Sequence, residues 1–110
     1  MKILHHPDVQ DIHLSSVLYA LSDPIRLSVV SQIAKQGAQP CSYFGLPIAK
    51  STASHHLRTL REAGVVRVRV QGTQHIVDLR SEDLEARFPG LLASILHAAA
   101  LSDPLSDSSK

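Results

Sequence analysis

One helix-forming segment, residues 50–63, constrains the fold more than any other part of the sequence, because a glycine and two short strands follow it at once. Within this segment Ala53, Leu57 and Leu60 recur at the spacing of one helix face, while the opposite face carries small polar and basic side chains. Gly64 supplies a stop signal. The pattern predicts a helix that buries one narrow stripe and leaves a polar ridge exposed.

A β-hairpin is predicted directly after this helix. Residues 65–70 place valines 66, 68 and 70 on one face and basic side chains on the other, which is typical of a half-buried strand. Residues 71–74 (Gln-Gly-Thr-Gln) have the chemistry of a tight turn, and residues 75–79 return as the partner strand. All three valines are expected to face the core.

Two helices are predicted on the N-terminal side of residues 50–63. The first begins near Asp8 or Asp11 and runs to residue 21 along an apolar side. The second covers residues 24–36, because Asp23 is a good N-cap and Pro24 sits where its missing N–H costs nothing. Residues 38–49 contain two prolines and a glycine, and a short helical turn is expected around 41–44.

The C-terminal part is predicted to be helical. Ser81 is expected to cap a helix, Pro89-Gly90 interrupts it, and a last helix covers 91–101. The order of elements predicts a mainly α fold with a small β-hairpin, a winged helix-turn-helix with terminal helices added. Residues 1–101 are expected to form one domain, and residues 102–110 a disordered tail.

Length and composition limit the class of protein. With 110 residues, 44% of them hydrophobic, the chain suits one globular core. No apolar run is long enough to cross a bilayer, and residues 1–7 lack the apolar core of a signal peptide. The single cysteine cannot form an intrachain disulfide, so we expect a cytoplasmic protein.

Charge is unevenly distributed although the net charge is only +1. Five basic residues face one acidic residue between positions 50 and 69, whereas five acidic residues face two basic ones from position 81 onward. A locally basic region of this kind is expected of a protein that docks a polyanion through one face. The alternative is ordinary scattered surface charge.

Double-stranded DNA is the predicted partner, because a slim helix reads bases through short side chains near its N-terminal end. The predicted contacts of the helix are Lys50, Ser51, Thr52, Ser54, His55 and Arg58. Those of the hairpin wing are Arg67, Arg69, Gln71, Thr73 and Gln74. His56 lies beside the apolar stripe, so a packed, hydrogen-bonded histidine is favoured there over a base contact. Alternatively, the polar face is merely solvated, and the wing arginines only keep an edge strand soluble.

Three segments of the sequence resemble the ArsR-type (arsenic-repressor-like) bacterial transcription regulators. Residues 21–27, Leu-Ser-Asp-Pro-Ile-Arg-Leu, look like that family's helix-joining segment. Residues 51–66, Ser-Thr-Ala-Ser-His-His-Leu-Arg-Thr-Leu-Arg-Glu-Ala-Gly-Val-Val, are similar to its recognition helix, and the basic hairpin to Gly72 stands where the family has its wing. The resemblance implies a dimeric repressor that leaves its operator when a signal arrives. Only Cys41 stands where metal sensors of the family often carry a Cys-x-Cys pair.

A homodimer is expected, because two modules related by a two-fold axis can read an inverted repeat. The terminal helices offer an apolar stripe for this contact, and its expected residues are Ile12, Leu91, Leu92, Ile95 and Leu96. The alternative is that these side chains only pack on their own core.

Catalysis and a resident cofactor are not expected, since no phosphate-binding loop, paired carboxylates or nucleophile motif is present. Seven histidines and Cys41 leave open a metal- or thiol-responsive sensor on the same scaffold, although no ligand set of metal-binding spacing emerges. Cys41 is favoured as a buried structural thiol. A protein-interaction module that has lost DNA binding is a further alternative. Operator, target genes and effector are not encoded in any recognisable pattern.

Overall fold

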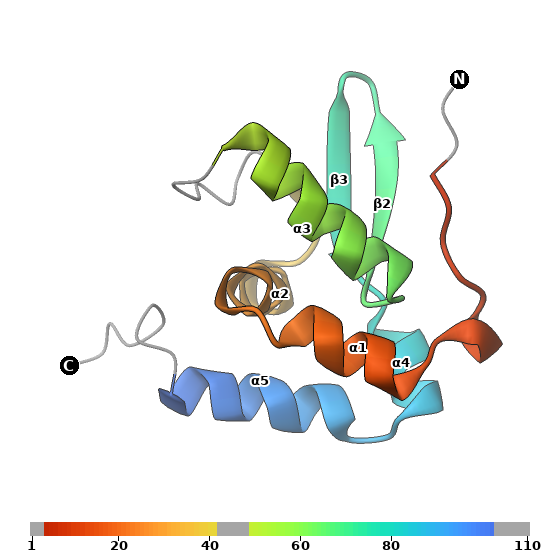
Figure 1. Cartoon of the computed structure of the whole chain (residues 1–110), viewed down its shortest axis with the longest axis vertical. Helices are drawn as coiled ribbons and strands as arrows, with labels where there is room; N and C mark the ends of the chain where they lie inside the picture. Colours follow the sequence, from red (N-terminus) through yellow and green to blue (C-terminus); the bar gives the residue numbers. More distant parts are fainter. Residues whose placement is uncertain (1–3, 42–48, 103–110) are drawn as a thin grey trace.

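The computed structural model describes residues 4–41 and 49–102, which form five α-helices and one small sheet (Figure 1). A 3-10 turn at Val9–Asp11, η1, precedes α1 (Leu14–Leu21), α2 (Pro24–Gln36) and β1 (Gln39–Pro40). Then come α3 (Lys50–Glu62), β2 (Val66–Gln71), β3 (Gln74–Leu79), α4 (Ser81–Arg87) and α5 (Leu91–Ser102). The strand order is β1-β3-β2, with both pairs antiparallel. The winged helix-turn-helix expected from the sequence is confirmed.

The elements are layered so that α3 and the hairpin lie at one end and α5 at the other (Figure 1). The hairpin extends beyond the helices as a wing, and α2 passes between α3 and α5. The core between these layers draws on nearly every element, and its largest fully buried side chains are Ile12, Val17, Val30, Ile33, Leu60, Val65, Val66 and Val77. Burial of these groups supplies most of the driving force for folding.

The predicted boundaries of α2 are confirmed, because the Asp23 carboxylate accepts hydrogen bonds from the backbone N–H groups of Ile25 (2.9 Å) and Arg26 (3.0 Å). Pro24 is the first helical residue, and Gly37 ends the helix with φ of 83°. The start of the first helix was predicted wrongly. It begins at Leu14, because Ile12 is held in an extended conformation with its side chain 1% exposed in the core.

Three further details differ from expectation. Gln39–Pro40 forms a short strand on the outer edge of β3, which the sequence did not reveal. Ser81 is the first residue of α4 and not its cap, because Arg80 occupies the cap position. Val70 is 51% exposed, since β2 has passed the end of the core at this point.

The expected helical turn at 41–44 lies outside the described residues except for Cys41. The expected tail lies outside them from residue 103 onward, and its first residue, Ser102, belongs to α5. Over the residues that are described, no helix combines the length and apolar character required to cross a membrane.

Candidate nucleic-acid interface

The recognition-type helix α3 starts abruptly at Lys50, with Ala49 in the cap position and no side chain closing its first turn. Leu60 is fully buried, whereas Ala53 and Leu57 are half-buried, so the predicted apolar stripe faces the body of the protein. The predicted contact residues Lys50, Ser51, Thr52, Ser54, His55 and Arg58 are all exposed on the remaining surface. One helix therefore presents an open row of hydroxyl, imidazole and basic groups.

A buried polar cluster fixes α3 on α2. The Arg26 side chain is 5% exposed, and its guanidinium donates hydrogen bonds to the Ala20 carbonyl (2.7 Å) and to Nδ1 of His56 (3.0 Å). The same guanidinium lies 5.3 Å from the centre of the Tyr19 ring. Because His56 Nδ1 accepts, the ring carries its hydrogen on Nε2. His56 is thus packed and hydrogen-bonded, as the sequence predicted, and it helps to fix the position of α3 on α2.

Among the six exposed contact residues of α3, Arg58 forms an ion pair, with its Nε 3.1 Å from the Glu62 carboxylate one turn along the helix. Both side chains are more than half exposed, so the pair is weak and water competes for both groups. Arg58 can therefore exchange Glu62 for a stronger anion, such as a phosphate, at little cost.

The wing separates its predicted contact residues into two groups. Gln71, Thr73 and Gln74 are exposed at the turn, where Gly72 adopts a φ of 64°, and Arg69 is exposed one residue before Val70. Arg67 lies instead at the base of the wing, and its guanidinium is 3.3 Å from the Asp83 carboxylate on α4. The tip is thus unobstructed, whereas Arg67 is already engaged in bracing the hairpin.

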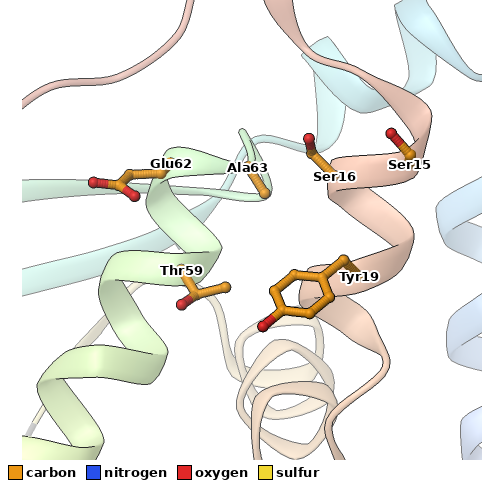
Figure 2. A pocket seen from close by; sticks show the side chains of 6 residues that line it. All are labelled: Ser15, Ser16, Tyr19, Thr59, Glu62 and Ala63. Atoms are coloured by element: carbon orange, nitrogen blue, oxygen red, sulfur yellow. The ribbon is translucent and has the colours of Figure 1, made fainter.

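An open groove of about 370 Å³ separates α1 from α3 (Figure 2). Tyr19 projects from α1 toward Thr59 on α3, and the other lining residues are Ser15, Ser16, Glu62 and Ala63. The groove offers hydroxyl groups for hydrogen bonding, but its one carboxylate is already paired with Arg58. This lining lacks the convergent acid, base or nucleophile that a catalytic cleft requires.

The residues expected at a dimer interface occupy different environments. Ile12 is 1% exposed and packs against Gly64, so it has almost no surface to offer a partner. The four α5 residues Leu91, Leu92, Ile95 and Leu96 are half-buried against the core. The predicted interface did not include Leu14 and Leu18 of α1, which are each 45% exposed. Their i, i+4 spacing places them on one face of α1, whereas the predicted interface named only Ile12 from this part of the chain.

The candidate sensor residues are dispersed in the structure. Cys41 is exposed, which contradicts the expectation of a buried structural thiol. In the part of the chain that the structure describes, no three side chains from histidine, cysteine, aspartate or glutamate converge as metal ligands would.

An exposed polar helix seated on a second helix, with a projecting basic hairpin beside it, defines a winged helix-turn-helix protein that binds DNA. Residues 21–69 match a family model described as a helix-turn-helix domain. The HTH-type transcriptional regulator YceK of Bacillus subtilis, itself uncharacterized, is 33% identical over 84 residues, covering 74% of this chain and 84% of YceK.

Two solved structures have a similar fold. The transcriptional repressor BigR from Xylella fastidiosa aligns with a TM-score of 0.61 and 24% identity, over 80% of this chain and 83% of BigR. An ArsR family transcriptional regulator aligns with a TM-score of 0.62 and 22% identity, over 80% of this chain and 93% of that protein. The chain belongs to the HTH-type transcriptional regulators, and its fold is that of an ArsR family regulator, the family that the sequence motifs resemble.

Proposed function

We propose that this regulator acts as a homodimeric, cytoplasmic repressor that reads an inverted-repeat operator with α3 and the wing. The observation that carries the proposal is the two-sided character of α3, whose Leu60 side is buried while Ser51, His55 and Arg58 are exposed. BigR, which has the same fold, is a transcriptional repressor, and this supports repression over activation. Residues 1–101 would act as one unit in this role together with Ser102, the last residue of α5, and without catalysis or a resident cofactor.

Base reading is assigned to the short side chains in the first turns of α3, which are Ser51, Thr52, Ser54 and His55. These residues are exposed and small enough for close approach to base edges in the major groove. Lys50, Arg58 and Arg69 are assigned to phosphates, which supply affinity and register. Gln71, Thr73 and Gln74 at the wing tip are placed to follow the neighbouring groove. Arg67 would contact the DNA only after its ion pair with Asp83 breaks.

Dimerisation is assigned to the exposed stripe of α1 and to α5. Leu14 and Leu18 are each 45% exposed, and Leu101 at the end of α5 is 77% exposed. Helix α5 carries no charged residue between positions 91 and 102, which is unusual for a terminal helix that faces only water. Ile12 is left out of the proposed interface because its side chain is buried within the protomer.

The experiment that tests the function is a footprint over fragments of the native chromosome, beginning with the promoter next to the protein's own gene. We expect protection of two half-sites related by a two-fold axis and separated by about one or more helical turns. The same fragment should resist random competitor DNA at physiological salt. Equal binding to specific and random fragments would contradict the proposed recognition of an operator.

Replacing Arg58 with alanine should weaken operator binding and reduce the slope of log affinity against log salt by about one. The reason is the loss of one phosphate contact from the exposed ridge of α3. Electrophoretic shift assays at several salt concentrations measure both quantities. The matched control is Arg67→Ala, which removes an arginine held by Asp83 at the wing base and should change the slope less. An unchanged slope for Arg58→Ala would show that Arg58 does not contact the DNA.

Replacing Leu18 with glutamate should shift the protein from dimer to monomer at micromolar concentration, because a charge in the core of an apolar interface is left without a partner. Sedimentation velocity gives the mass directly. Val70→Glu is the control, since Val70 is equally apolar and 51% exposed but lies on the wing. Wild-type protein that is monomeric, or a Leu18→Glu variant that remains dimeric, would contradict the proposed interface.

A further inference from the structure

The N-terminal residues 4–12 run as a strap beside β2 and are tied to distant parts of the chain (Figure 1). Arg61 at the end of α3 donates to the carbonyl of His5, and Arg80 donates to that of Pro7 at 2.8 Å. Arg87 donates twice to the Ile12 carbonyl, at 2.7 and 3.1 Å. Three arginines, one at the end of α3, one at the cap of α4 and one in the last turn of α4, therefore hold this segment through its backbone.

His6 makes the central contact of this strap. The backbone N–H of Val68, on the outer edge of β2, donates a hydrogen bond of 3.0 Å to Nε2 of His6. An imidazole nitrogen accepts a hydrogen bond only when it carries no proton, so the docked ring is neutral and has its hydrogen on Nδ1. His6 also forms a hydrogen bond with the backbone of Leu4. The ring thus stands in for a neighbouring strand at the open edge of the sheet.

The surroundings of His6 oppose a positive charge. Partial burial and the guanidinium groups of Arg61, Arg80 and Arg67 lower the pKa of His6 from its ordinary value of 6.5, while the hydrogen bond with Leu4 acts in the opposite direction. The carboxylate of Asp83 on α4 is shared between Arg80 (2.9 Å) and Arg67 (3.3 Å), and Asp78 and Glu82 line the same hollow as these two arginines. The charged groups that act on a proton at His6 are the three guanidinium groups, and all of them oppose it.

We propose that His6 is a positioning residue that fixes the recognition helix against the wing, and that its protonation releases the strap. The geometry carries this inference, because His6 holds β2 while the carbonyl of the adjacent His5 holds Arg61 of α3. When the ring is protonated, the Val68 N–H loses its acceptor and the imidazolium faces three guanidinium groups. Detachment relieves both penalties and frees Arg61 from the strap.

The direction of the pH dependence follows from the lowered pKa of His6. Below about pH 6.5 the detached strap binds a proton, whereas the docked strap stays neutral until its own lower pKa is reached. The free energy of docking is therefore fully present above pH 6.5 and falls as the solution is acidified below that value. The strap is docked at pH 7.5 and loosens at pH 5.5.

Nitrogen-15 NMR on the full chain tests the proposal without any DNA, so its outcome is independent of the proposed operator and dimer. At pH 7.5 the His6 ring should show the signature of the tautomer protonated at Nδ1. The protection factor of the Val68 amide against hydrogen exchange, corrected for intrinsic exchange at each pH, should fall at least tenfold between pH 7.5 and 5.5.

Two variants separate the proposed role from general acid effects. In His6→Gln the amide oxygen still accepts from Val68 but does not titrate, so the protection factor should become independent of pH. In His5→Gln the neighbouring ring is lost while the backbone carbonyl remains, so the tenfold fall should persist. A His6 ring protonated at Nε2, a flat wild-type profile, or a His6→Gln profile that still falls tenfold would each overturn the proposal.

Discussion

Gly64→Ala should lower the free energy of unfolding by about 2–4 kcal/mol, a large part of the stability of a domain of this size. Gly64 follows α3 with φ of 87°, a left-handed conformation that costs an alanine about 1 kcal/mol or more. An added Cβ would also lie 2.7 Å from Cγ1 and 2.9 Å from Cδ1 of Ile12, which is far inside van der Waals contact. Chemical denaturation at neutral pH measures the loss.

Gly37→Ala is the matched control for this prediction. Gly37 ends α2 with φ of 83°, but nothing lies within 4 Å of its hypothetical Cβ. It should therefore cost only the backbone term of about 1 kcal/mol. In an Ile12→Ala background the overlap at Gly64 disappears, so Gly64→Ala should cost about as little there as Gly37→Ala does. Equal losses at both glycines in the parent protein would refute the predicted clash.

Arg26→Met should destabilise the protein by about 3 kcal/mol, although methionine fills much of the same volume. The side chain is 5% exposed, and its loss leaves the Ala20 carbonyl and His56 Nδ1 without the donor they have in the native protein. The contact between α3 and α2 then lacks its buried hydrogen bond between Arg26 and His56. Thermal and denaturant unfolding measure the change, and the NMR signals of the His56 ring should move at the same time.

The same substitution at an exposed helix position provides the control for Arg26. Arg58→Met removes a guanidinium that is 69% exposed and paired only with Glu62, so its effect on unfolding should stay within about 0.5 kcal/mol. A similar stability of both variants would show that the buried cluster contributes nothing beyond an ordinary surface arginine.

Elements with strong local signals were predictable from the sequence. The Asp23-Pro24 cap, the apolar spacing of α3 and the valine alternation of the hairpin each determine structure within a few residues. Exposure of the six contact residues on α3 followed from the same periodicity. His56 could be separated from them because it lies beside the buried stripe, and its hydrogen bond to Arg26 confirms that placement.

Features that depend on distant partners were not predictable. Arg26, Arg80 and Arg87 look like ordinary surface arginines in the sequence, yet each donates to a backbone carbonyl six or more positions away. The start of α1 was misplaced because Ile12 fits a helical stripe by spacing but is held extended by packing against Gly64. Strand β1 was missed because two residues, one of them proline, carry no periodicity.

The short strand β1 has a consequence for self-association of the protein under stress. Pro40 lacks an N–H, and β1 has only two residues, so the sheet presents little that a foreign strand could extend on that side. On the opposite side the amide of Val68 is occupied by an imidazole. Addition of a foreign strand along β2 therefore requires the N-terminal segment to leave Val68, and removing that segment by limited proteolysis should make the protein more prone to form fibrils.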